Sequence, residues 1–334
     1  MEQSIQKITK LFDPDFAKSY IAKNSPYLGE KINLDPTLTI TPIKSNIGVS
    51  SYHVVIRYDS KSIKGSPIFC SAHSEENREN AYRALLFIQS KSKANKNFIT
   101  PVPMFFDKEI NAFFYQGYNG KNLLYYLKNP LIDISGFLKK TALWASSLHS
   151  LPTDGAENYN HDNSKIKTTI PGPEKFLTKI KRLFPELFDK IKAAFEKISS
   201  KEEEILSKLD KKCLIHGDLH PENVIITKNG EVSVIDFTDM CLSDWTRDVG
   251  NFIQQLGYMS RGTRNKEYIA RAQKIFYEEY LKNRGIKETD EIKNRVDLYK
   301  SWSSLRSTIY FLTKASPEPE NAKATLCEIN INKL

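Results

Sequence analysis

The sequence lacks any apolar run of about eighteen residues, the minimum length for a helix that spans a membrane. Its first residues, MEQSIQKITKLF, also lack the apolar core of a secretory signal peptide. Cysteine is scarce, and Cys70, Cys213, Cys241 and Cys327 show no paired spacing. Neither a disulfide framework nor a zinc site is therefore expected. These absences together predict a cytoplasmic protein without a membrane segment.

Glycine is also sparse, at 14 of 334 residues, and no Gly-x-Ser-x-Gly pattern marks a serine nucleophile. Basic residues exceed acidic ones by 49 to 40, which gives a formal net charge of +9. The lysines are dispersed, and no helix-turn-helix, zinc-ligand or aromatic RNA-binding pattern accompanies them, so no nucleic-acid partner is expected. With 40% hydrophobic and 11% aromatic residues, the chain can bury a substantial core.

Polar groups are concentrated in one stretch, CLIHGDLHPENVIITKNGEVSVIDFTD, which runs from Cys213 to Asp239. Two runs inside it, Asn223–Thr227 and Val232–Asp236, are rich in β-branched residues and predict strands. Asn229 and Gly230 between them form a strong hairpin signal. The hairpin returns the chain to its starting end, so Asp236 is expected near Asn223.

Asp218 lies five residues before Asn223 (223 − 218), in a loop that can approach the same end of the hairpin. Two carboxylates and one carboxamide would then converge. Mg²⁺ takes oxygen ligands of this kind, usually one or two carboxylates together with phosphate oxygens and water. The stretch therefore predicts a magnesium site, although a single Asp or Asn in a loop more often shapes a turn.

The string HGDLHPENV…VIDF resembles the catalytic loop and metal-binding segment of the aminoglycoside phosphotransferase and choline kinase superfamily. The resemblance implies an α+β, bilobal protein-kinase-like fold, with an antiparallel-sheet N-lobe and a mainly helical C-lobe. Residues 1–117 would form the nucleotide-binding lobe, and residues 118–334 the catalytic and acceptor-binding lobe. The implied reaction moves the γ-phosphoryl group of ATP to a hydroxyl of a small molecule, with Mg²⁺ as cofactor and GTP as an alternative donor.

The resemblance also implies roles for particular residues. Asp218 would accept the proton of the acceptor hydroxyl, while Asn223 and Asp236 would hold magnesium. Supporting roles fall to His216 and His220, which would shape the catalytic loop.

Two further positions match the family beyond this loop. Asp248, in LSDWTRDVGNFIQQLGY, matches an aspartate that ties down the loop in the family. His149 is expected to be a packing residue rather than a catalyst.

The N-terminal part reads as strand, turn, strand, strand and helix, beginning near Thr39. SNIGVSSYHVV resembles the family's nucleotide loop but holds only Gly48, so an ordinary hairpin explains it equally well. The helix in EENRENAYRALLFIQ carries Glu79, which matches the family's helix glutamate better than Glu76 does.

The family's third-strand lysine is missing, because PIFCSAHS has Ser71 or Ala72 at that position. Such a lysine normally grips the α- and β-phosphates. Lys44, Lys61 and Lys64 are the alternatives from neighbouring strands or loops.

FYQGYNGKNL resembles the hinge of these kinases, where backbone near Gln116 and Tyr118 would meet the adenine and Gly120 would let the chain turn. An edge strand running into a loop is the alternative. Residues 152–176 are polar and are expected to form a loop. The following segment predicts an amphipathic helix with a break near Pro185.

The acceptor is left open among sugars, amino alcohols and aminoglycoside-like compounds. The net positive charge favours a neutral or anionic acceptor over a polycation. Three functions compete: a small-molecule O-kinase, a nucleotide-binding pseudokinase or scaffold that the missing lysine would explain, and an atypical protein kinase. The third is disfavoured, because no Arg precedes Asp218 and no Asp-Phe-Gly or Ala-Pro-Glu segment follows. The oligomeric state is not indicated.

Overall fold

The computed structural model describes residues 2–25, 38–61, 66–92, 98–169 and 172–329. The chain forms two compact units. Unit 1 comprises Met1–Lys121 together with Ile225–Thr238, and unit 2 comprises Asn122–Val224 together with Asp239–Leu334. The first division falls four residues beyond the boundary expected at residue 117 (121 − 117), and the segment Ile225–Thr238 joins the N-terminal unit although it lies far along the chain.

Unit 1 is built on a five-stranded antiparallel sheet with the order β1-β2-β3-β5-β4. Its strands are β1 (Thr39–Ile47), β2 (Tyr52–Asp59), β3 (Ile68–His73), β4 (Val102–Asp107) and β5 (Ala112–Gln116). Buried and half-buried residues alternate along β2 and β3, as the two-residue period of a strand requires. The predicted strand order along the chain is confirmed.

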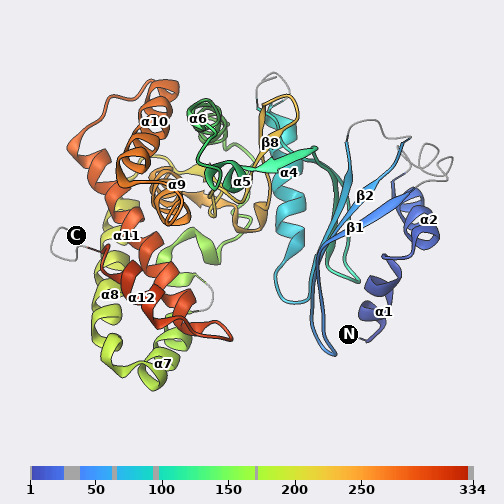
Figure 1. The fold of residues 1–334 in the computed structure, drawn as a ribbon, viewed down its shortest axis with the longest axis horizontal. Coiled ribbons are helices and arrows are strands. Elements are labelled where there is room, and N and C mark those ends of the chain that lie inside the picture. Colours follow the sequence, from blue (N-terminus) through green and yellow to red (C-terminus); the bar gives the residue numbers. More distant parts are fainter. Residues whose placement is uncertain (1, 26–37, 62–65, 93–97, 170–171, 330–334) are drawn as a thin grey trace. The chain divides into compact units, whose positions relative to one another are not determined.

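Helices cover both faces of this sheet (Figure 1). α1 (Glu2–Lys10) and α2 (Pro14–Asn24) pack on one face, where Ile8 and Ile21 join a core with the buried side chains of β2. α4 (Arg78–Ser92) lies on the other face, where Ala81, Leu85 and Ile88 are buried. α1 and α2 are not among the elements predicted above.

A second, three-stranded sheet has the order β6-β8-β9 and contains the predicted hairpin. Its strands are β6 (Gly120–Asn122), β8 (Val224–Thr227) and β9 (Val232–Val234). The Thr227 N–H donates to the Glu231 carbonyl at 2.8 Å, and Gly230 adopts a φ of +73° in the turn. Glycine adopts this left-handed conformation at little cost, so the predicted Asn-Gly hairpin is confirmed.

Unit 2 is mainly helical. Its helices are α5 (Leu123–Leu127), α6 (Ser135–His149), α7 (Pro173–Leu183), α8 (Pro185–Lys208), α9 (Thr246–Met259), α10 (Lys266–Arg284), α11 (Asp290–Thr313) and α12 (Pro319–Leu326). The short strands β7 (Cys213–Ile215) and β10 (Cys241–Ser243) pair antiparallel. The predicted break near Pro185 is confirmed, since α7 ends at Leu183 and α8 begins at Pro185. In the described part of the chain, no helix is long and apolar enough to cross a membrane.

The prediction of a loop over residues 152–176 was only partly right. Two short 3₁₀ helices, η1 (Asp162–Ser164) and η2 (Ile166–Thr168), lie within it, and α7 has begun by Pro173. Asn163 is buried, and Arg247 Nη2 donates to its side-chain oxygen at 2.7 Å. A distant partner on α9 thus orders a segment whose own sequence is polar.

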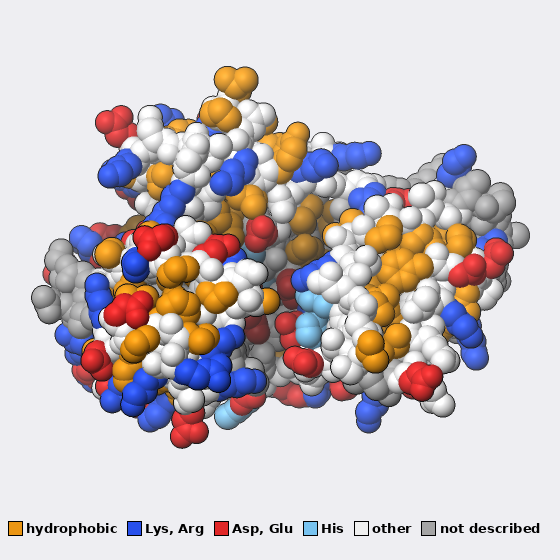
Figure 2. All heavy atoms as spheres, turned by 60° about the horizontal axis from the view of Figure 1, so that its bottom comes forward, with side chains coloured by type: hydrophobic (Ala, Val, Ile, Leu, Met, Phe, Trp, Pro, Cys, Tyr) orange, Lys and Arg blue, Asp and Glu red, His pale blue; other side chains and the backbone are white. Residues whose placement is uncertain are grey.

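The four cysteines are all free thiols, in line with their unpaired spacing. On the face shown in Figure 2, Lys and Arg side chains are mixed with Asp and Glu rather than gathered into one basic patch. The excess positive charge is thus not concentrated on that face.

Candidate active site

The loop that carries Asp218 follows β7 and is fastened by Asp248 of α9. One carboxylate oxygen of Asp248 accepts the His216 N–H at 2.7 Å, and the other accepts the Gly217 N–H at 2.9 Å. His149 of α6 also lies against Asp248, with its Nε2 3.0 Å from Oδ2. All of these groups are buried, so the loop is held by charge-assisted hydrogen bonds shielded from water.

The pKa values of this pair are shifted in ways that follow from burial and pairing. Burial alone would raise the pKa of Asp248, but the hydrogen bonds from His149 and from the backbone of His216 hold it below its ordinary value. Burial lowers the pKa of His149, against the opposing effect of Asp248. Asp248 is therefore a carboxylate acceptor at neutral pH, and His149 is a buried packing residue.

Gly217 shows why the loop needs glycine at this position. Its φ is +82°, and a Cβ there would lie 2.2 Å from the carbonyl oxygen of Asp239. Side chains are excluded by this contact as well as by the left-handed backbone. The tight approach brings Asp218, the next residue, onto the surface of a cavity.

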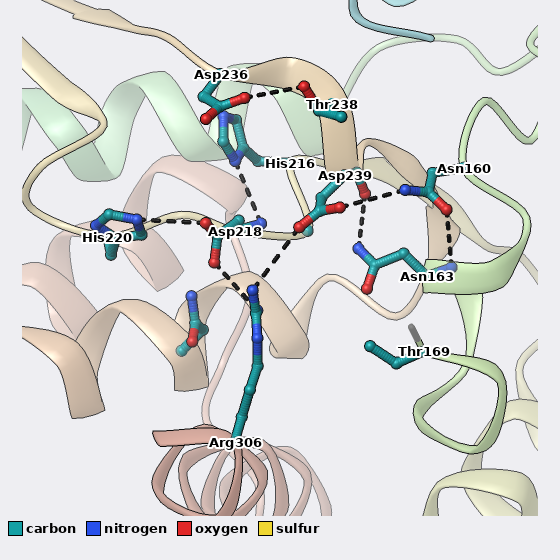
Figure 3. Close-up of polar contacts among 12 residues, drawn as sticks. Asn160, Asn163, Thr169, His216, Asp218, His220, Asp236, Thr238, Asp239 and Arg306 are labelled. Carbon is teal, nitrogen blue, oxygen red and sulfur yellow. Dashed lines mark hydrogen bonds and ion pairs between the residues drawn. The ribbon is translucent and has the colours of Figure 1, made fainter. Parts of the chain in front are cut away.

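Asp218 is held by two cationic or polar neighbours (Figure 3). Arg306 Nη1 of α11 lies 3.0 Å from its Oδ1, and His220 Nε2 lies 3.3 Å from its Oδ2. Burial alone would raise the pKa of Asp218, but these two neighbours lower it well below its ordinary value. Burial would lower the pKa of His220, which Asp218 instead raises. At neutral pH, Asp218 is thus an ionised carboxylate with a fixed orientation.

Asn223 follows on the same loop and is buried. Its Nδ2 donates to the Asp218 carbonyl at 3.0 Å, and its N–H donates to the His220 carbonyl at 3.0 Å. Since Nδ2 is used in this way, the amide oxygen is the atom that a cation would meet.

Asp239 and Arg306 belong to the site of unit 2 although sequence reasoning missed both. Arg306 Nη2 lies 3.8 Å from Asp239 Oδ2, and Asn160 Nδ2 donates to Asp239 Oδ1 at 3.2 Å (Figure 3). Asn163 donates to the Asp239 carbonyl at 2.7 Å. The second aspartate of IDFTD was a visible signal for Asp239, whereas Arg306 lies in a helix with no motif around it.

A cavity of about 710 Å³ in unit 2 opens beside Asp218. Apart from His220, its charged lining consists of three cations and two acids, Lys128, Arg261, Arg306, Asp218 and Glu222. The remaining lining residues with polar or aromatic side chains include Asn251, Gln255, Tyr258, Ser303, Ser307, Tyr310, Phe311 and Asn321. The lining offers donors and aromatic faces in greater number than carboxylates.

Asp236 of unit 1 has an unusual backbone and a cationic partner. Its φ is 64°, a left-handed value that costs energy in a residue with a side chain. Its Oδ1 accepts a hydrogen bond from the Thr238 hydroxyl at 3.0 Å and lies 3.3 Å from Arg78 Nη1. About half of the side chain is exposed, at 48%, so its second oxygen can take a further ligand.

Arg78 lies close both to the third-strand position and to one of the two glutamates considered for the helix. Ser71 of β3 lines a small cavity in unit 1 together with Arg78 and Asp236. Of the two glutamates considered, Glu76 contacts Arg78, at 3.0 Å from Nη2. The Glu79 N–H donates a hydrogen bond to the side-chain oxygen of Asn77 at the start of α4. Lys64, one of the proposed replacements, lies outside the described residues.

The expected nucleotide-contacting segments lie at the ends of strands in unit 1. Gln116 is the last residue of β5, and the next N–H, that of Gly117, donates to the Pro67 carbonyl at 2.9 Å. The Tyr118 hydroxyl donates to the Thr100 carbonyl at 3.3 Å. Gly48 stands in the turn between β1 and β2, where its N–H donates to the Ser51 carbonyl at 2.8 Å.

The residues expected to bind Mg²⁺ have suitable chemistry. Asn223 offers an amide oxygen and Asp236 a carboxylate oxygen, both hard donors of the type that Mg²⁺ prefers. Within the described ranges, no three His, Cys, Asp or Glu side chains form a metal-binding cluster. Mg²⁺ commonly takes phosphate and water oxygens as its remaining ligands.

Residues 137–284 match the model of the Phosphotransferase enzyme family, a segment that includes Asp218, Asn223, Asp236 and Asp248. A comparison with curated proteins finds no match to the sequence.

Solved structures match nearly the whole chain. A choline kinase from Cryptosporidium parvum is 15% identical, with a TM-score of 0.61, and the match covers 94% of each chain. An ethanolamine kinase from Plasmodium vivax is 17% identical, with a TM-score of 0.57, and covers 90% of this chain and 87% of its own. An ADP-bound aminoglycoside phosphotransferase is 17% identical, with a TM-score of 0.54, and covers 92% of this chain and 97% of its own. The predicted fold and family resemblance are thus confirmed: the chain has the protein-kinase-like fold of these kinases, and residues 137–284 carry the signature of the phosphotransferase enzyme family.

Proposed function

We propose that this protein is a small-molecule O-kinase that transfers the γ-phosphoryl group of ATP to an alcohol. The observation that carries the proposal is the setting of Asp218, an ionised carboxylate on a loop fastened by Asp248, at the edge of a cavity of about 710 Å³. A cavity of that volume is in the usual range for small ligands. Asp218 would orient the acceptor hydroxyl and take its proton late in the reaction.

The lowered pKa of Asp218 is compatible with this role. Phosphoryl transfer has a loose transition state, so positioning matters more than the strength of the base. Arg306 and His220 hold the two carboxylate oxygens in place, which fixes the direction from which a hydroxyl can approach. Mg²⁺ held by Asn223 and Asp236 would neutralise phosphate charge when bound, with GTP as an alternative donor.

The acceptor that the cavity favours is neutral or anionic. Lys128, Arg261 and Arg306 outnumber Asp218 and Glu222 on its walls. A polycationic aminoglycoside would meet repulsion there, whereas a hydroxyl compound with a carboxylate or phosphate would meet cationic donors. A neutral polyol would use the amide and hydroxyl groups of the lining.

The decisive experiment measures ADP formation from ATP or GTP with Mg²⁺ across a panel of neutral, anionic and cationic alcohols. Asp218→Asn should abolish acceptor-dependent turnover while leaving nucleotide binding within about threefold. Nucleotide binding without any turnover that depends on Asp218 would instead favour a pseudokinase, and transfer to a protein would favour the protein-kinase alternative.

A matched pair of variants tests the acceptor class. Lys128→Met should raise KM for an anionic acceptor but leave KM for a neutral one unchanged. Lys139→Met, an exposed position on α6 outside the cavity lining, serves as the control. Preferred use of a polycation would contradict the charge argument.

A further inference from the structure

The small cavity of unit 1 is lined by a cationic side chain that does not come from the third strand. Val55, Ser71, Phe113 and Tyr115 line it from the sheet, while Arg78 lines it from the first turn of α4. Among the described lining residues, Arg78 is the one cationic side chain. The volume of this cavity is about 90 Å³, which gives room for roughly three water molecules.

We propose that Arg78 replaces the missing third-strand lysine and grips the phosphates of the nucleotide. The inference rests on the proposed function, because it assumes that Asp236 serves the nucleotide's metal ion. A cation that helps to hold phosphates must lie beside that carboxylate. Arg78 meets this requirement, since its Nη1 lies 3.3 Å from Asp236 Oδ1.

Arg78 is held in a fixed orientation by its other contacts. Nη1 donates to the Thr238 hydroxyl at 2.7 Å, and Nη2 lies 3.0 Å from Glu76 Oε2 and 3.4 Å from His53 Nε2. The side chain is only 5% exposed. A guanidinium placed in this way is preorganised, because little side-chain freedom remains to be lost when an anion binds.

One donor of Arg78 has no protein partner. Its Nε is buried and finds no hydrogen-bond acceptor among the described residues. Buried N–H groups are nearly always paired, so an unpaired one on a charged group points to an oxygen atom supplied from elsewhere. A phosphate oxygen has the charge and the geometry that a guanidinium prefers.

The serine at position 71 is consistent with the replacement of the third-strand lysine by Arg78. Serine is small and uncharged, so its position on β3 leaves the shared cavity to Arg78. A lysine at position 71 would bring a second positive charge beside the guanidinium, which like-charge repulsion disfavours. The two positions should therefore be interchangeable as sources of the cation, but not useful together.

The competing explanation is that Arg78 merely braces Asp236 and Thr238. The two roles differ in their effect on ligands with and without phosphates. We would measure binding of Mg-ADP and of adenosine to the full chain by calorimetry and thermal shift. The variants are Arg78→Met, Arg78→Lys, the double variant Ser71→Lys with Arg78→Met, and Arg83→Met, an exposed control on the same helix.

If Arg78 grips phosphate, Arg78→Met should weaken Mg-ADP binding by about 10-fold to 100-fold, the range for a lost charge-assisted contact. Adenosine binding should stay within about threefold, and Arg83→Met should behave as the wild type. The double variant should regain part of the lost affinity. Arg78→Lys, which keeps the charge without the planar fork, should show a smaller loss for Mg-ADP alone, and this comparison decides the matter if Arg78→Met does not fold.

The inference would be overturned if the wild type binds Mg-ADP and Arg78→Met binds it equally well or more tightly. The proposed function would then still stand. Equal losses for adenosine and Mg-ADP in Arg78→Lys would also overturn it, because a brace would then explain both. A wild type that binds neither ligand would overturn the proposed function itself.

Discussion

Replacing Asp248 by alanine should destabilise unit 2 strongly. The carboxylate accepts the N–H groups of His216 and Gly217 and contacts Nε2 of His149, all in a buried site. Each hydrogen bond to a charged group contributes about 1.5–3 kcal/mol. Loss of the acceptor leaves these donors unpaired, so we expect the free energy of unfolding to fall by about 3–5 kcal/mol. That is a large part of the 5–15 kcal/mol typical of a folded protein.

The measurement is urea unfolding followed by tryptophan fluorescence. All three tryptophans, Trp144, Trp245 and Trp302, lie in unit 2, so the signal reports that unit. Asp297→Ala is the control, since Asp297 is half exposed and pairs with an exposed lysine on α11. It should change the unfolding free energy by no more than about 0.5 kcal/mol. A loss below about 1 kcal/mol for Asp248→Ala would refute the idea that this carboxylate fastens the loop.

The pH dependence of stability provides a second check on the same residue, with the variant Asp248→Asn. A carboxyl whose pKa is lowered by folding stabilises the protein above its ordinary pKa of 3.8, and the contribution disappears as pH falls through the lower folded value. The difference between wild type and Asp248→Asn should therefore be full at pH 7 and shrink in acid below about pH 4. A difference that stayed constant with pH would mean that the charge of Asp248 contributes nothing.

Three further outcomes follow from the geometry. Gly217→Ala, with φ at +82° and a clash at Asp239, should lower the free energy of unfolding by at least about 1–3 kcal/mol. Gly136→Ala, with open space around it, should be neutral or stabilising in the same urea assay. Because folding raises the pKa of His220, its stabilising effect should be present below about pH 6.5 and lost as pH rises through the folded value, so His220→Gln should cost more at pH 5.5 than at pH 8. Arg295→Met should cost about 3–5 kcal/mol, since it leaves the buried Asp244 carboxylate without the guanidinium 2.9 Å away, and a loss under 1 kcal/mol would contradict this.

Local patterns were sufficient to predict much of the fold. The Asn229-Gly230 turn and its two strands follow from short-range chemistry, and the strands and helix after Thr39 follow from hydrophobic periodicity. The motif around Asp218 also identified the loop that the structure fastens through Asp248. In each case the signal lies within a few residues of the feature that it predicts.

The missed features depend on partners that are distant in sequence. Arg306 lies 88 residues beyond Asp218 (306 − 218) on a helix without a motif, yet the two side chains meet at 3.0 Å. The replacement cations predicted from the sequence belong to strands or loops, whereas the Arg78 side chain comes from the start of α4. Asn163 lies in a polar segment and is held by partners distant in sequence, Arg247 and Asp239. Such tertiary contacts override what a local window can indicate.

The assignment of Ile225–Thr238 to unit 1 has a consequence for how the protein is made. The first continuous segment of unit 1 ends at Lys121. Its remaining strands are complete only after Thr238 has been translated, 117 residues later (238 − 121). At about 5–20 residues per second, a nascent chain waits roughly 6–23 seconds with this unit incomplete. During that interval unit 1 lacks the segment that carries Asp236, so this unit can be completed only after most of the chain has been synthesised.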